Sequence, residues 1–206
     1  IDKEVATNPS AYRPGNTHEL LPRHHFNYSE LLLIRFKSKI VSILKDVFGP
    51  TLCYIPDFQT QINMIGVRDD GLPGWHVDSA SEGHTNYLYR KHYRFAKVAL
   101  TLHRNTDEWG GGIDIVPKGH LFPVRTGLKK LDFKIKKLHN RFCQTHRFKR
   151  VYSEPGDLLF FDSRLPHTST VGDNLDTQKQ KQGLLVNLPP EAKKYVVFWN
   201  ACAKED

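Results

Sequence analysis

Most of the chain after residue 50 is divided into short apolar runs that are separated by clusters of turn-forming residues. Runs such as FAKVALTLH, DLLFFD and KYVVFWNA have the length and the β-branched and aromatic content of strands. Gly, Pro, Asn and Asp gather between them, where the chain must reverse direction. Many short strands divided by turns are typical of two packed antiparallel sheets. The predicted fold class is therefore mainly β with helical decoration (α+β), with a sandwich or jelly roll as its core.

A length of 206 residues favours one domain. Residues 28–49 carry apolar side chains at helical spacing and stop at Gly49-Pro50, which predicts one amphipathic helix. The expected organisation is a single domain, residues 1–206, whose parts are an N-terminal arm (1–27), the helix (28–49), a β core (51–201) and two insertions into that core (79–93 and 122–150). Because the first residue is not Met and no secretory signal follows, we expect the chain to be a trimmed form or a piece of a longer protein.

Two compositional features limit the setting in which the protein works. No apolar run approaches the roughly 20 residues of a membrane-spanning helix, so we expect no membrane span. Cys53, Cys143 and Cys202 are odd in number and widely separated, which argues against a disulfide framework and against a zinc ribbon. This cysteine usage predicts a reducing compartment, and we expect a cytoplasmic location.

The net charge of +8 has a local source. Residues 122–150 hold ten Lys or Arg against the single acid Asp132. Such a segment can attract an anionic small molecule, a nucleic acid or an acidic partner, but it can equally be a solvated face. Nucleic acid is not favoured as the partner, because no recognisable nucleic-acid module accompanies the segment.

The triplet His76-Val77-Asp78 can present two metal ligands, because side chains at i and i+2 of a strand point to the same face. By itself the triplet is weak evidence, since roughly one is expected by chance in a chain with this composition. A third ligand is available at His167, which follows the predicted buried strand 158–161. Two imidazoles and one carboxylate leave coordination positions open for chemistry, as in non-haem Fe(II) oxygenases, although zinc can use the same residues.

Three segments, GWHVD, WGGGIDIVPKGH and EPGDLLFFDSRLPHTS, occur in this order over residues 60–201. Together they resemble the phytanoyl-CoA dioxygenase-like branch of the Fe(II)/2-oxoglutarate oxygenases. The resemblance implies a double-stranded β-helix of the cupin-like, jelly-roll kind. It also implies that His76, Asp78 and His167 are the catalytic iron ligands, with 2-oxoglutarate and O2 as cosubstrates. The expected reaction is hydroxylation of a C–H bond of a small metabolite, and the net charge favours an anionic one.

One family feature is missing. Related enzymes place an Arg about ten residues after the distal His to hold 2-oxoglutarate, and this chain has no Arg after Arg164. The candidates for cosubstrate binding are polar residues near the expected site: Lys193 in place of that Arg, Lys97 as the next choice, Ser169 as a hydroxyl donor, and Gln61 and Asn63. The last two can equally be buried polar groups that are satisfied by the backbone.

Two other functions remain open from the sequence. A catalytically silent jelly roll would bind nucleic acid or another polyanion, and the missing Arg is its best support. A cupin-like metalloenzyme would keep the three metal ligands without using 2-oxoglutarate. Desaturation, ring closure and epimerisation use the same kind of metal centre as hydroxylation and stay open as alternative outcomes.

Overall fold

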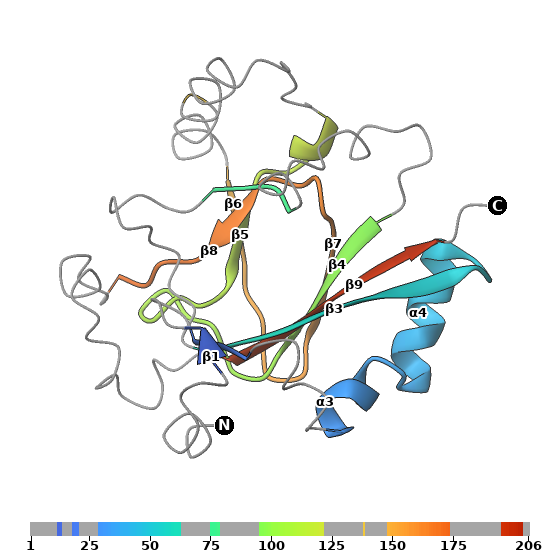
Figure 1. Cartoon of the computed structure of the whole chain (residues 1–206). Coiled ribbons are helices and arrows are strands. Elements are labelled where there is room, and N and C mark those ends of the chain that lie inside the picture. Colours follow the sequence, from blue (N-terminus) through green and yellow to red (C-terminus); the bar gives the residue numbers. More distant parts are fainter. Residues whose placement is uncertain are drawn as a thin grey trace.

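The structure is a computed structural model that describes residues 12–13, 18–20, 29–62, 75–78, 95–121, 138, 148–173 and 195–203. Its strands form a six-stranded and a three-stranded sheet, and every pairing in them is antiparallel. The large sheet has, in spatial order, β1 (Tyr12–Arg13), β2 (His18–Leu20), β3 (Leu52–Ile62), β9 (Tyr195–Ala203), β4 (Phe95–Thr101) and β7 (Leu158–Asp162). The small sheet has β6 (Lys149–Val151), β5 (Ile113–Ile115) and β8 (His167–Ser169). The two sheets lie on opposite sides of the core in Figure 1.

Alternating side chains of the large sheet enter two separate cores. Ala99 of β4 and Phe198 of β9 cluster with Ile113 of the small sheet, so this face of the large sheet is the inner face of a sandwich. Their neighbours Val98 and Trp199 point the other way and pack with residues of a helix. The sandwich therefore has an inner face that can hold a site and an outer face that is covered by helix.

The covering helix is α4 (Ser38–Phe48), which buries Leu44 and Phe48 against the outer face (Figure 1). The sequence predicts one helix over residues 28–49, and this is wrong, because α3 (Ser29–Ile34) is separate from α4. The backbone of Lys37 is extended, with φ −57° and ψ 132°, and it ends the helical path. The Tyr54 hydroxyl donates to the carbonyl of Arg35 at 2.9 Å, which satisfies an acceptor left open by the break.

The structure merges two predicted strands and adds short ones. The apolar runs TLCYIP (51–56) and TQINMIGV (60–67) read as separate strands in the sequence, whereas β3 runs through Pro56 to Ile62. The register against β9 shifts between Ile55 and Phe58, and a bulge there accommodates a proline that has no N–H to donate. The arm contributes β1 and β2 to the edge of the large sheet beside β3. The strands β6 and β8 have three residues each and are too short for the apolar pattern to reveal.

A short 3-10 helix, η2 (Gly119–Leu121), follows β5. The insertion 79–93 lies outside the described residues, as does most of the basic insertion 122–150. Within the part of the chain that the structure describes, neither α3 nor α4 is long and apolar enough to cross a membrane.

Candidate metal centre

The backbone places the two predicted histidine ligands directly opposite each other. His76 and His167 form an antiparallel bridge, in which each N–H donates to the carbonyl of the other residue at 2.9 Å. Opposed residues of such a pair present their side chains on the same face of the sheet. The two imidazole rings accordingly lie with their centroids 4.3 Å apart. Two residues that are distant in sequence thus become neighbours through one strand pairing.

The carboxylate of the triplet completes a three-residue cluster. The N–H of Asp78 donates to the carbonyl of Ser163 at 3.0 Å, which fixes the backbone beside the strand that leads to His167. The Oδ1 atom of Asp78 is 3.8 Å from Nε2 of His76 and 3.8 Å from Nε2 of His167. One potential ligand atom from each residue lies within 4.8 Å of the other two. An ion with ligand distances of about 2.1 Å can reach all three after small side-chain adjustments.

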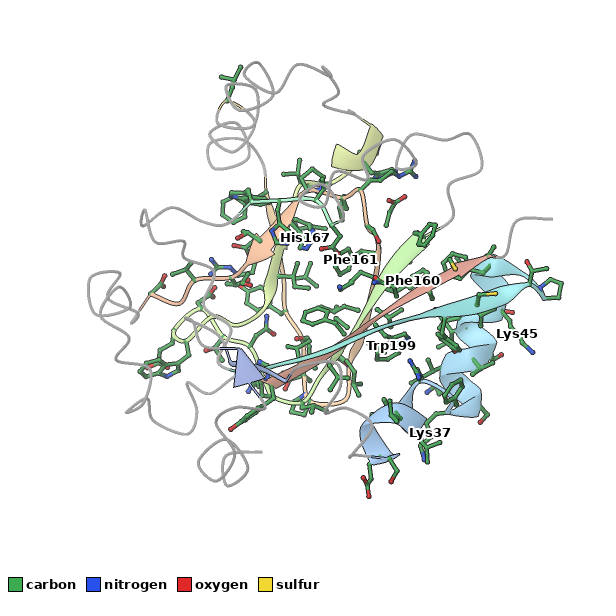
Figure 2. All side chains as sticks on the ribbon, in the orientation of Figure 1. Lys37, Lys45, Phe160, Phe161, His167 and Trp199 are labelled. Carbon is green, nitrogen blue, oxygen red and sulfur yellow. The ribbon has the colours of Figure 1, made fainter. Side chains whose placement is uncertain are left out.

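The surroundings of His167 keep its ring neutral and oriented. Burial, together with the charge of the neighbouring His76, lowers the pKa of His167 from 6.5 to about 4. Its Nδ1 lies 2.9 Å from the carbonyl of Leu165, which selects the tautomer with a proton on Nδ1 and leaves Nε2 with a free lone pair. The ring of Phe161 packs edge-on at 4.9 Å and limits its rotation. Figure 2 shows His167 and Phe161 directed into the space between the sheets.

The cluster has the features of a metal site. The Oδ2 atom of Asp78 is buried and has no hydrogen-bond partner among the described residues, a costly state for a carboxylate oxygen that coordination would relieve. Side-chain exposure rises from 9% at His167 through 21% at Asp78 to 48% at His76, so the cluster is closed at one end and open at the other. Two imidazoles and a carboxylate suit Fe(II) or zinc, and three ligands leave positions for exogenous molecules.

The glycine run before β5 allows the chain after β8 to approach closely. A Cβ at Gly110 would lie 2.3 Å from the carbonyl oxygen of Thr170, a position that only glycine tolerates, and its φ of +63° also favours glycine. This close approach extends the ladder between the two segments, since Gly111 donates to Thr170 and Thr170 donates to Gly112, both at 2.9 Å. The GGG sequence therefore anchors the segment that carries His167.

A second close contact lies on the other side of His167. A Cβ at Gly119 would lie 2.5 Å from the ring of Pro166, the residue that precedes this histidine. The N–H of Val116 donates to the carbonyl of Pro166 at 3.0 Å. The turn that contains PKGH therefore shapes the entry into β8, which gives this sequence motif a structural role.

A charged network on the opposite face of the small sheet was not predicted from the sequence. The buried Asp114 of β5 accepts hydrogen bonds from Arg150 Nε at 3.2 Å and from the Thr170 hydroxyl at 2.8 Å. Arg150 also binds Asp107, and the hydrogen bond from its guanidinium holds the pKa of that carboxyl below the usual value. The network joins β5, β6 and the end of β8, because all of its members come from these segments or the adjoining turn. An acid inside the run IDI was the one signal for it in the sequence.

The predicted cosubstrate ligands fall into two groups. Lys97 and Ser169 are described, and they lie on the inner faces of the two facing sheets. Lys97 is 8% exposed and pairs in register with Phe161, and its charge contributes, after burial and His76, to the lowered pKa of His167. Ser169 follows His167 by two residues on β8, so both point to the same side of this strand.

The remaining candidates are not placed by the structure. The backbone of Gln61 pairs with Val196 of β9, but its side chain lies outside the described part. Asn63 and Lys193 lie outside the described residues altogether. Their proposed roles stay predictions.

A scan of protein families and a search of curated proteins give no match for this sequence. A search of solved structures gives several matches. The non-heme alpha-ketoglutarate-dependent epimerase SnoN from nogalamycin biosynthesis aligns with a TM-score of 0.63 and 11% identity, over 98% of this chain and 68% of SnoN. HygX from Streptomyces hygroscopicus, solved with nickel and 2-oxoglutarate bound, aligns with a TM-score of 0.61 and 12% identity, over 99% of this chain and 80% of HygX.

EctD from S. alaskensis, solved with bound Fe, aligns with a TM-score of 0.56 and 15% identity, over 98% of this chain and 65% of EctD. The core is a double-stranded β-helix. The jelly-roll fold class predicted from the sequence is thereby confirmed. The chain spans 32% of EvdMO1, another structural neighbour, so some of the proteins that share this fold are much longer. Identities at this level establish a shared fold only, and function must be argued from the site.

Proposed function

We propose that the protein is a non-haem Fe(II)- and 2-oxoglutarate-dependent dioxygenase of the phytanoyl-CoA dioxygenase-like branch, and that it hydroxylates a small anionic metabolite. The observation that carries the proposal is the convergence of His76, Asp78 and His167 on the inner face of a double-stranded β-helix. The structural neighbours support it, because SnoN is described as alpha-ketoglutarate-dependent and HygX was solved with 2-oxoglutarate.

Bound Fe(II), with O2 and 2-oxoglutarate, would supply the oxidising power that attacks an unactivated C–H bond. The protein's own contribution is to hold three ligands at one end and leave the other end open. His167 is fixed by burial and by the Leu165 carbonyl, while His76 lies on the exposed side. We therefore place the substrate on the His76 side of the cluster, where solvent reaches it.

We propose that Lys97 forms an ion pair with the far carboxylate of 2-oxoglutarate and that the Ser169 hydroxyl donates a hydrogen bond to it. Lys97 is 8% exposed on the inner face, and a cation that is largely removed from water attracts a carboxylate more strongly than one in water. Lys97 pairs in register with Asn200 and Phe161, so it stands in the row of inner-face residues next to the ring that packs on His167. Lys193 is the alternative anchor, and a lysine at either position would replace the missing Arg as a point charge.

The proposal that the substrate is anionic rests on the positive charge of the protein. The chain carries +8 in total, and ten basic residues stand between residues 122 and 150. A positive field raises the local concentration of anions and speeds their association. Hydroxylation is the proposed outcome, and epimerisation is the alternative, because SnoN, which shares the fold, is described as an epimerase. The three cysteines are odd in number and widely separated in the sequence, which favours a reducing compartment, and we place the protein in the cytoplasm.

The decisive experiment is an anaerobic titration of the metal-free protein with Fe(II) and then 2-oxoglutarate, followed by visible absorption. A weak charge-transfer band is expected in the wild type and should be absent in His167→Ala. His120→Ala is the matched control, since it removes a histidine outside the three-residue cluster and should keep the band. Consumption of 2-oxoglutarate in air, measured as succinate, would complete the assignment.

Two results would favour the other functions. Bound iron without a band, and without succinate formation, would support a metalloenzyme that does not use 2-oxoglutarate. Failure to bind iron, combined with salt-dependent retention on heparin or nucleic acid, would support a catalytically silent module that binds a polyanion. Either result would remove the role assigned to Lys97.

A further inference from the structure

Cys53 of β3 and Cys202 of β9 stand directly opposite each other in the large sheet. Opposed residues of an antiparallel pair have Cα atoms about 4.5 or 5.5 Å apart, depending on which of the two ladder positions they occupy. A disulfide bridges Cα separations of about 4.4 to 6.8 Å. Both ladder positions therefore lie within the range that a disulfide can span without moving the strands.

The two thiols also share one face of the sheet. Leu52 and Tyr54, which flank Cys53, pack against the outer core. Ala201, which precedes Cys202, also belongs to this core. Because side chains alternate along a strand, Cys53 and Cys202 point to the inner side. Both are free thiols and half-buried, so an oxidant of small size can reach them.

We propose that Cys53 and Cys202 are a thiol pair that closes into a reversible cross-strand disulfide when the protein meets a peroxide. One oxygen of hydrogen peroxide is transferred to the first thiol, which becomes a sulfenic acid, and the other oxygen leaves as water. The second thiol then attacks that sulfur, forms the S–S bond and releases the transferred oxygen as a second water. The two sulfurs lose two electrons and two protons in total, and the O–O bond of the peroxide is the group reduced. A thiol reductant reverses the reaction by exchange.

The local environment keeps the pair reduced until such an oxidant appears. Burial, together with the neighbouring Cys53, raises the pKa of Cys202 above its ordinary value. A protonated thiol is a poor nucleophile, so exchange with small disulfides is slow at neutral pH. The same protonation slows the reaction with peroxide, so closure is expected under sustained exposure to the oxidant.

Formation of the disulfide would link β9 covalently to β3. The strand β9 pairs with β4, and the next inner-face pair along β9 is Asn200 with Lys97. The cross-link would therefore fix the strand that lies beside the proposed cosubstrate anchor, and it would close a long loop of chain between its ends. The inference rests on the strand register alone and holds whether or not the protein uses 2-oxoglutarate.

The test uses the full chain, freed of metal with a chelator and treated with hydrogen peroxide. Free thiols are then blocked with iodoacetamide and the protein is digested for mass spectrometry without reduction. The expected result is a peptide pair joined through Cys53 and Cys202, which disappears after dithiothreitol. The thermal midpoint should rise by about 5 to 10 °C on oxidation.

Single variants separate this pair from the third cysteine. Cys53→Ser and Cys202→Ser should lose both the linked peptide and the thermal shift, whereas Cys143→Ser should keep both. The proposal is overturned if peroxide leaves the two thiols separately alkylated, converts them separately to sulfinic acids, or links either of them to Cys143. Peptide mapping of the wild type decides the matter even if a serine variant does not fold.

Discussion

Replacing Lys97 with Met tests whether the large sheet supplies the cosubstrate anchor. Lys97 is 8% exposed on the inner face of β4, and its Nζ lies 5.5 Å from the centre of the Phe198 ring. Met has a similar length and fills the same space without a charge. The substitution therefore removes the proposed ion pair with 2-oxoglutarate while preserving the packing of the inner core.

The size of the effect follows from the burial of the charge. Two unit charges 4 Å apart attract by about 4 kcal/mol at the effective dielectric constant of about 20 that describes most protein sites. Removing one partner of a buried charge pair from a complex costs about 2 to 4 kcal/mol. The expected result is that Lys97→Met weakens 2-oxoglutarate binding by about 30- to 700-fold.

The assay is the charge-transfer titration under anaerobic conditions with Fe(II) held at saturation. Iron affinity should change little, because Lys97 is not among the three residues that could bind the metal. Lys97→Arg should restore part of the affinity, since it keeps the charge but has a different shape. Lys193→Met is the matched control and should bind 2-oxoglutarate as the wild type does.

The opposite pattern would refute the reasoning. If Lys97→Met binds 2-oxoglutarate normally and Lys193→Met loses binding, the anchor is Lys193 and the buried lysine has another role. A loss of folding in Lys97→Met, seen as a lowered thermal midpoint without metal, would instead show that the lysine supports the core. Circular dichroism of the variants before titration separates these cases.

Three further substitutions test other parts of the site. Ser169→Ala should weaken 2-oxoglutarate binding by about tenfold, the value of one hydrogen bond to a charged group, and a titration that matches the wild type would remove Ser169 from the site. Gly119→Ala would place a methyl group 2.5 Å from the ring of Pro166 and should displace His167, so both the thermal midpoint and the Fe(II) affinity should fall; unchanged Fe(II) affinity would contradict this. Asp114→Asn weakens the hydrogen bonds that Asp114 accepts from Arg150 and Thr170 on the outer face of the small sheet. It should lower the free energy of unfolding by about 2 kcal/mol, which is a fall of about 4 to 8 °C in the thermal midpoint. A thermal midpoint equal to that of the wild type would show that these hydrogen bonds contribute little.

Much of the β core can be predicted from local patterns. Strands β4, β7 and β9 carry apolar runs that end at turn residues, and the structure places them within a residue or two of the predicted bounds. Local patterns do not predict features that depend on contacts with residues distant in the sequence. The residues at 35–37 show no helix-breaking type, and the break that separates α3 from α4 is visible only with Tyr54 of β3 beside it.

The sequence by itself determined the chemistry that this chain can carry: a His-x-Asp triplet, a distal histidine, glycines before β5, and a surplus of positive charge. These are properties of residue types and of short spacings along the chain, and both can be read directly from the amino-acid sequence. Only the tertiary structure decided which of these residues meet. The bridge between His76 and His167 and the pairing of Cys53 with Cys202 depend on strand register, which is set by the packing of both sheets, and a shift of one residue would turn these side chains to opposite faces. Burial, which lowers the pKa of His167 and desolvates Lys97, is likewise a property of the assembled sandwich.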